Sequence, residues 1–329
     1  MRKTLLLAAW LCCLQAMAQY TPAGRPHQIA TVDISLHDNA RSKVVPLRIT
    51  FPQEQGVYSV ILFSHGAGGS GHGYASIVQY WASYGYVILQ PTYEDSLELQ
   101  RNSGAASSGM RGVMQEAHDS AVWVSRIRDA ELVLNSLARI EQLAPAVKGK
   151  MNAGSIGAGG HSLGTQTSLA LAGATLTLVP GAQPKSFADG RIRAALLMSA
   201  QGPGQMGFTE CSWDKVRVPM MSMTGSRDRG AEMQSPEWRK AAYDHAPGPD
   251  KFHVFIEGAS HFSFAGDSAG QRRPLARFRA GKEQEIERLI NSISLAFWDA
   301  YLKGDAAARK VLEPASMKAA GGAVTLYSK

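Results

Sequence analysis

Five consecutive residues near the middle of the chain, Gly160-His161-Ser162-Leu163-Gly164, match the pattern G-x-S-x-G. A run of small residues leads into them, and the helix-forming residues 167–172 follow. A sharp turn from a strand into a helix strains the backbone of the central serine and exposes its Oγ, and both flanking positions must be glycine because neighbouring backbone leaves no room for a Cβ. The pattern alone is weak in a chain with 33 glycines, so the prediction depends on this context. We predict Ser162 to be a nucleophile; the alternative is that it only caps the following helix.

A serine hydroxyl needs a neighbouring base to take its proton, and His261 is the best placed of nine histidines. It follows the predicted strand 252–257 in the loop 258–262, and a doubly wound fold places its active groups in loops at the carboxyl ends of strands. The other histidines considered lie before the sheet, beside the serine, inside a strand or near helix ends: His27, His37, His161, His253, His118 and His245. We expect His161 to point away from the serine and His253 to be structural.

The base in turn needs a carboxylate that holds its tautomer and stabilises the imidazolium. Asp228 follows the predicted strand 218–224, one strand before His261. Asp189 and Asp214 are rivals, but both precede a strand instead of following one. We predict Asp228 to be the acid; the alternative is a salt bridge with Arg227 or another basic residue.

Acyl transfer also needs N–H donors for the oxyanion, and the backbone N–H of Leu163 is one natural donor. A second is expected from the loop His65-Gly66-Ala67-Gly68-Gly69, whose glycines let main-chain N–H groups approach a substrate oxygen. A phosphate-binding loop is the competing interpretation, but no Gly-x-x-x-x-Gly-Lys pattern is present. The sequence has neither His-Glu-x-x-His nor a Cys/His cluster, so we predict no metal and no cofactor.

Segments typical of buried strands alternate along the chain with segments typical of helices. The strand candidates are 29–36, 44–51, 57–63, 86–90, 155–160, 192–198, 218–224 and 252–257. The helix candidates are 74–84, 120–143 as one long helix, 163–172, 236–245 and a last helix with an apolar face from Ile286 to Tyr301. Strands separated by helices imply an α/β fold with a mostly parallel sheet of about eight strands and helices on both faces.

Residues 96–118 are rich in Ser, Gly and Met and lack clear periodicity, so we expect a long loop or lid there. Met110 and Met114 in this segment either shape the acyl or alcohol pocket or belong to an idle surface loop. No internal repeat and no linker divides the chain. We therefore predict a single domain over residues 19–329.

The amino terminus has the pattern of an export signal. Arg2 and Lys3 precede the short apolar stretch 4–14, and Ala16-Met17-Ala18 has small residues where a signal peptidase reads them. We predict a signal peptide at residues 1–18, cleavage before Gln19, and a periplasmic or secreted protein. A lipoprotein is the alternative because of Cys12 and Cys13, but Leu11 stands where a small residue is needed. The apolar run is too short to span a bilayer, so no stable membrane insertion is expected after cleavage.

The composition is that of an ordinary globular chain, with 45% hydrophobic and 19% charged residues, and it excludes wholesale disorder and a multi-span membrane protein. The net charge is +7, and removal of Arg2 and Lys3 leaves 32 basic against 27 acidic residues, or +5. The basic residues form no run interleaved with aromatic residues, so we predict no nucleic-acid partner. Cleavage also leaves Cys211 as the single cysteine, which excludes an internal disulfide.

The chain order Ser162, Asp228, His261, together with the loop 65–69, resembles the α/β-hydrolase fold. The stretches 63–69, 81–87, Arg128-Asp129 and 160–164 are similar to a narrower group of dienelactone-hydrolase-like proteins, platelet-activating-factor-acetylhydrolase-like enzymes and bacterial polyester hydrolases. The resemblance implies Ser162 as nucleophile, His261 as base, Asp228 as acid, and Ala67 and Leu163 as the oxyanion N–H donors.

Three features of the sequence depart from that group. Thr165 stands where a second glycine commonly follows the elbow, and the strand 155–160 is poor in bulky β-branched residues. The disulfide that polyester hydrolases often carry near the site is not possible here.

These observations predict an exported serine hydrolase that cleaves small-molecule or lipid-like carboxylic esters through an acyl-enzyme. An amidase or peptidase would use the same three residues, and a non-catalytic binding protein on this fold is a third possibility. The sequence makes no prediction about oligomeric state.

Overall fold

The computed structural model describes residues 20, 22, 24–104, 109–266, 280–318 and 322–329. The predicted signal peptide, residues 1–18, lies outside the described residues. Within the described part of the chain, no helix is long and apolar enough to cross a membrane.

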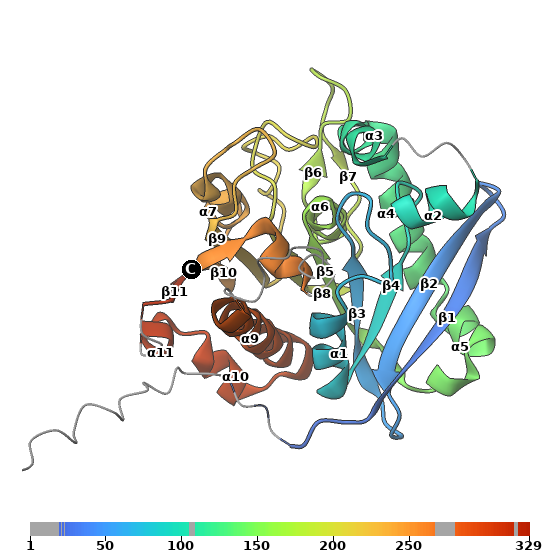
Figure 1. Ribbon diagram of the computed structural model, residues 1–329, viewed down its shortest axis with the longest axis horizontal. Helices are drawn as coiled ribbons and strands as arrows, with labels where there is room; N and C mark the ends of the chain where they lie inside the picture. The colour runs from blue at the N-terminus through green and yellow to red at the C-terminus, as the bar shows by residue number, and fades with distance from the viewer. Residues whose placement is uncertain (1–19, 21, 23, 105–108, 267–279, 319–321) are drawn as a thin grey trace, which may run out of the picture.

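A nine-stranded, mostly parallel sheet runs through the centre of the molecule in the order β1-β2-β4-β3-β5-β8-β9-β10-β11 (Figure 1). Strands β4, β3, β5, β8, β9 and β10 run parallel to one another, whereas β1 and β2 at one edge and β11 at the other pair antiparallel with their neighbours. The bounds are β1 Ile29–Asp38, β2 Lys43–Pro52, β3 Tyr58–Ser64, β4 Tyr86–Pro91, β5 Met151–His161, β8 Ile192–Met198, β9 Met220–Arg227, β10 Lys251–Ser260 and β11 Val324–Ser328. The predicted α/β-hydrolase fold is confirmed, with β11 as the strand that the sequence pattern did not indicate.

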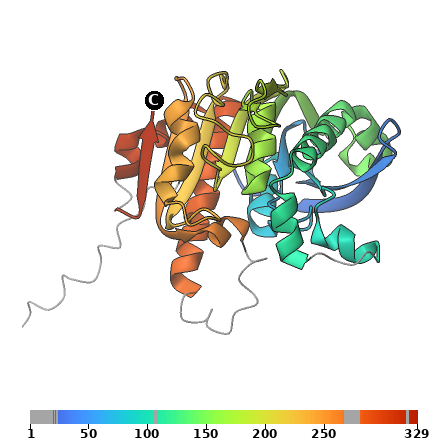
Figure 2. The ribbon, with the colours of Figure 1, turned by 90° about the horizontal axis from the view of Figure 1, so that it is seen from above.

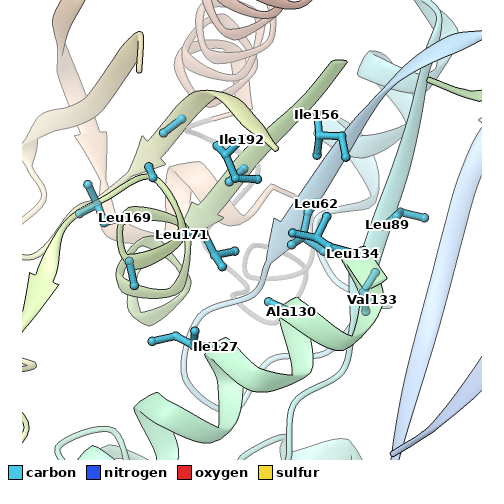
Figure 3. Close-up of a cluster of buried hydrophobic side chains, with 14 of the residues drawn as sticks. Leu62, Leu89, Ile127, Ala130, Val133, Leu134, Ile156, Leu169, Leu171 and Ile192 are labelled. Atoms are coloured by element: carbon cyan, nitrogen blue, oxygen red, sulfur yellow. The ribbon is translucent and has the colours of Figure 1, made fainter. Parts of the chain in front are cut away.

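Helices cover both faces of this sheet (Figures 1 and 2). Helices α1 and α9 pack on one face, and α4 and α6 pack on the other. Strand β3 is apolar on both faces. Ile61 and Phe63 belong to the first core, with α1 and α9, and Val60 and Leu62 belong to the second core, with α4 and α6. Figure 3 shows the second core, where side chains of α4 meet those of β3, β4 and β8. The helix bounds are α1 Ala75–Ser83, α4 Ser120–Asn135, α6 Leu163–Leu171 and α9 Ala280–Trp298.

Shorter elements complete the described chain. They are the 3-10 turns η1 Pro145–Val147 and η3 His261–Ala265, the two-residue strands β6 Thr175–Leu176 and β7 Lys185–Ser186, a π-helical turn Asp299–Lys303 that continues α9, and the helices α10 Ala306–Val311 and α11 Pro314–Lys318. The predicted helix 236–245 divides into the 3-10 turn η2 Pro236–Lys240 and the helix α7 Ala241–His245.

Two expectations about the helices are wrong. The segment 96–118 is not an irregular loop, because it contains α2 Leu97–Asn102 and α3 Gly109–Glu116, and Ser96 caps α2 by accepting a hydrogen bond from the Glu98 N–H. The segment 120–143 is not one helix, since α4 ends at Asn135 and α5 Leu137–Leu143 follows after Ser136. At the break the Ser136 N–H bonds to Val133 O in a tighter turn.

The glycines of β5 make room for a buried tryptophan. A Cβ at Gly157 would lie 2.5 Å from Cζ3 of Trp298, and one at Gly159 would lie 3.4 Å from its Cζ2. Trp298 ends α9 and is 0% exposed. The scarcity of bulky residues in this strand is therefore a packing requirement of the helix that covers it.

We expect Gly157→Ala to lower the free energy of unfolding by about 1–3 kcal/mol, because the enclosed indole of Trp298 has no free space into which it can move. Urea denaturation followed by circular dichroism measures this change. Gly154→Ala is the matched control in the same strand, since its Cβ would contact only the side-chain oxygen of exposed Asn152. Equal effects of the two substitutions would contradict the packing explanation.

Candidate active site

Ser162 lies in a sharp turn between β5 and α6, with φ 53° and ψ −124°. A Cβ at Gly160 would lie 2.4 Å from Gly164 O, and one at Gly164 would lie 2.0 Å from Ser64 O, so neither position has room for a side chain. The Ser162 hydroxyl makes no capping hydrogen bond to the helix. Thr165, which replaces the expected glycine, instead donates its hydroxyl proton to Ser162 O at 2.7 Å and so closes the turn.

The structure brings Ser162, His261 and Asp228 together at the carboxyl ends of β5, β10 and β9. Nε2 of His261 lies 3.1 Å from the Ser162 Oγ, and its Nδ1 lies 3.0 Å from Oδ1 of Asp228. The Asp228 side chain is completely buried, whereas that of His261 is 27% exposed. In the neutral ring, Nδ1–H donates to the carboxylate and Nε2 is free to accept the serine proton. The arrangement can deprotonate a serine hydroxyl.

Three further donors hold the carboxylate of Asp228. The hydroxyls of Ser199 and Thr224 donate to Oδ2 at 2.5 and 2.9 Å, and Arg239 Nε lies 3.0 Å from Oδ1. Burial alone would raise the pKa of the Asp228 carboxyl, but the hydrogen bond from His261 and the charge of Arg239 outweigh it, so that pKa lies below its usual range. The acid therefore stays ionised beside the histidine.

Arg239 is a residue of this site that the sequence did not indicate. It comes from η2, is 2% exposed, and donates to the backbone carbonyls of Asp228, Ser199, Ala200 and Arg229 at 2.9–3.0 Å. It thus joins the loops after β8 and β9. The cation beside Asp228 is Arg239, whereas Arg227 is exposed. Arg239 lies in a short polar segment without a helical apolar face, so no local pattern marks it as buried.

The two residues predicted as oxyanion donors, Ala67 and Leu163, meet the same small apolar cluster. Ala67 packs against a small apolar cluster that contains Leu163, and a Cβ on neighbouring Gly66 would lie 3.3 Å from the Ser162 Cβ. Among the described residues, neither the Ala67 N–H nor the Leu163 N–H donates to a protein acceptor. Both N–H groups are therefore available beside the serine.

The buried ion pair between Arg126 and Asp95 makes hydrogen bonds to the backbone of the loop 65–69. Arg126 of α4 donates to His65 O at 2.8 Å and to Gly66 O at 3.2 Å, and it forms two hydrogen bonds with Asp95 at 2.8 and 2.6 Å. Asp95 in turn accepts from the Gly68 N–H at 3.2 Å. Arg126 occupies an inward-facing position of α4 beside Ile127, and a charged residue at such a position is the signal that could have revealed it.

Three further histidines, His65, His161 and His253, are buried, and burial lowers the pKa of each so that it stays neutral. His65 accepts from the Tyr93 N–H at Nε2, 3.1 Å away, and burial lowers its pKa to about 4. His253 lies inside β10 with its Nδ1 2.7 Å from the Ser222 Oγ, and burial lowers its pKa to about 4 as well. His161 is 4% exposed and does not contact the Ser162 Oγ; its ring packs on that of His261 with centroids 4.7 Å apart.

Within the described residues, no group of three or more His, Cys, Asp or Glu side chains lies in a position to hold a metal ion.

The parallel sheet, the strained turn at Ser162 and the chain order Ser162, Asp228, His261 place the protein in the α/β-hydrolase superfamily. The family model described as Chlorophyllase matches residues 20–179, which include β1 to β5, the turn at Ser162 and α6. Two similar proteins are "Chlorophyllase-1, chloroplastic" of Citrus unshiu and of Citrus sinensis. Each is 22% identical over 280 residues, which cover 79% of this chain and 74% of the relative. At the level of the family, this similarity indicates a hydrolase that acts on esters.

Proposed function

We propose that this protein is a serine hydrolase that cleaves carboxylic esters through an acyl-enzyme. The observation that carries the proposal is the pair of contacts made by His261, at 3.1 Å to the Ser162 Oγ and at 3.0 Å to Asp228. The similarity to chlorophyllases supports an ester as the bond that is cleaved.

In the first half of the reaction, the Ser162 Oγ attacks the ester carbonyl carbon while Nε2 of His261 takes the hydroxyl proton. The negative charge that develops on the carbonyl oxygen is stabilised by the N–H groups of Leu163 and Ala67. The tetrahedral intermediate collapses, the C–O bond to the alcohol breaks, and His261 gives its proton to the leaving alcohol. Asp228 stabilises the imidazolium meanwhile. Water then attacks the acyl-enzyme by the same steps and releases the acid and Ser162.

Exposed apolar side chains support a substrate with an apolar part. Phe262 follows His261, is 61% exposed and packs edge-on against the histidine ring at 5.7 Å. Met110 on α3 is 56% exposed. These side chains favour a small-molecule or lipid-like ester.

The proposal predicts that a fluorophosphonate probe labels the folded protein at Ser162. Mass spectrometry should find the adduct on the peptide that contains Ser162, and Ser162→Ala should remain unlabelled. Ser136→Ala, which changes a serine remote from the site at the end of α4, is the matched control and should be labelled like the wild type. Labelling that persists in Ser162→Ala would exclude Ser162 as the nucleophile.

Two alternatives make different predictions in turnover assays. An amidase or peptidase should turn over a p-nitroanilide as well as the p-nitrophenyl ester of the same acid, whereas we expect turnover of the ester and not of the anilide. A non-catalytic binding protein should show no turnover. Ester hydrolysis that is lost in His261→Ala would eliminate that alternative.

We also propose that the protein is exported, with residues 1–18 as its signal peptide. The supporting observations are the basic residues Arg2 and Lys3, the short apolar stretch and the Ala16-Met17-Ala18 site. N-terminal sequencing of the protein from its native host should begin at Gln19, and cell fractionation should find it in the periplasm or the medium. An uncleaved cytoplasmic chain would refute the proposal.

A further inference from the structure

A buried tyrosine and a buried histidine connect the loop 65–69 to the backbone of His261. Tyr74 precedes α1 and is 6% exposed, and His161 ends β5 and is 4% exposed. The Tyr74 hydroxyl accepts from the Gly66 N–H at 2.9 Å and lies 2.9 Å from the His161 Nδ1. At the other side of the same ring, Nε2 lies 3.0 Å from the backbone O of His261.

The protons of this chain of groups can be placed from chemistry alone. The carbonyl oxygen of His261 only accepts, so the His161 Nε2 must carry the proton that is donated to it. A neutral ring then has Nδ1 as an acceptor, and the Tyr74 hydroxyl, which accepts from Gly66, donates its own proton there. Burial lowers the pKa of His161 well below its usual value and raises that of Tyr74 to about 12, so both groups stay neutral near pH 7.

We infer that Tyr74 and His161 are positioning residues that couple the oxyanion loop to the loop of the catalytic histidine. The inference rests on the proposed function. Tyr74 occupies the Gly66 N–H, and the next N–H along the loop is that of Ala67, which is left for the substrate. His161 holds the backbone of His261 and packs on its ring, which sets the distance from Nε2 to the Ser162 Oγ. A shift of about 1 Å in such a group can cost on the order of 100-fold in rate.

The competing explanation is that Tyr74 and His161 only pack in the core. Removing the hydroxyl of Tyr74 distinguishes this explanation from a positioning role. Its ring packs edge-on against Phe63 at 5.0 Å, and that contact survives in Tyr74→Phe, which removes only the hydrogen bonds. We expect Tyr74→Phe to lower kcat for a p-nitrophenyl ester about 10-fold or more, with KM changed by less than about twofold. Tyr80→Phe on α1 is the matched control and should leave both constants unchanged.

Variants of His161 test the second half of the connection. Glutamine can still donate to His261 O, so His161→Gln should retain more of the wild-type kcat than His161→Phe. The double variant Tyr74→Phe/His161→Phe should be no slower than His161→Phe alone, because both substitutions break one connection. An unchanged kcat in Tyr74→Phe, or losses that multiply in the double variant, would overturn the inference.

The hydrogen bonds can be tested without any turnover. Spectra of ¹⁵N-histidine-labelled protein at pH 7 should show His161 neutral, with its proton on Nε2, and Tyr74→Phe should move its Nδ1 resonance. A proton on Nδ1, or a charged ring, would overturn the inference even in an active enzyme. If the wild type has no esterase activity but these resonances are as expected, the proposed function fails while the connection stands.

Discussion

Asp228→Asn is expected to lower kcat for ester hydrolysis roughly 10⁴-fold, a magnitude known for the loss of this carboxylate in other serine hydrolases. The Asp228 carboxylate accepts the proton of His261 Nδ1 at 3.0 Å. An asparagine amide can instead donate to Nδ1, which moves the ring proton to Nε2, the atom that must accept from Ser162. The base then has the wrong tautomer although every heavy atom is in place. Steady-state kinetics on a p-nitrophenyl ester measures the loss.

Asp189→Asn is the matched control for this substitution. Asp189 is the rival carboxylate from the sequence, and in the structure it pairs with Arg191 and has no contact with His261. Its substitution should leave kcat within about twofold of the wild type. Circular dichroism should show that Asp228→Asn stays folded, since its side-chain oxygen can still accept from Ser199 and Thr224. A loss of less than 10-fold in a folded Asp228→Asn would contradict the assigned role.

Arg126→Met is expected to lower the free energy of unfolding by about 3–5 kcal/mol, because it leaves the buried carboxylate of Asp95 without a cation. Both side chains of this pair are 0% exposed. The carbonyls of His65 and Gly66 each lose the hydrogen bond from Arg126 in the same variant, so the oxyanion loop should loosen and kcat should fall as well. Denaturant unfolding measures the stability.

The pH dependence of the same variant should differ from that of the wild type. Burial would raise the pKa of the Asp95 carboxyl, but Arg126 outweighs it and lowers that pKa to about 2. Because the pKa is lower in the folded state than in the unfolded state, the pair stabilises the wild type above pH 4 or so, and this contribution is lost as the pH falls towards 2. In Arg126→Met the charge that lowers this pKa is gone, and burial favours the protonated acid. The difference in stability between the two proteins should therefore shrink as the pH falls.

Two controls complete this experiment. Arg128→Met changes an exposed arginine that pairs with Glu131 on the same helix, and it should change stability by less than about 0.5 kcal/mol. Arg126→Met/Asp95→Leu removes both charges and should recover part of the lost stability. A double variant that is less stable than Arg126→Met would show that the unpaired carboxylate is not the cause.

The regular elements of this protein could be predicted because local sequence decides them. Buried parallel strands need continuous apolar runs, and 192–198 is recovered with the same bounds as β8. The turn at Ser162 could be predicted for a similar reason, since only glycine fits where Gly160 and Gly164 meet neighbouring backbone. The expectations for 96–118 and 120–143 are wrong because helix ends depend on local contacts that periodicity does not reveal, such as the cap at Ser96 and the tighter turn between Val133 O and the Ser136 N–H.

The sequence by itself determined the α/β architecture, the residues Ser162, Asp228 and His261 as candidates, and the place of each directly after a strand. Only the tertiary structure decided what holds them: Arg239 beside Asp228, Arg126 and Asp95 under the loop 65–69, and the connection through Tyr74 and His161. The physical reason is that hydrophobic periodicity and turn chemistry act between near neighbours in the chain, whereas these polar contacts join residues that are mostly distant in sequence. Tyr74 and His161, for example, are 87 positions apart, and only the folded sheet brings the hydroxyl of one to the ring of the other.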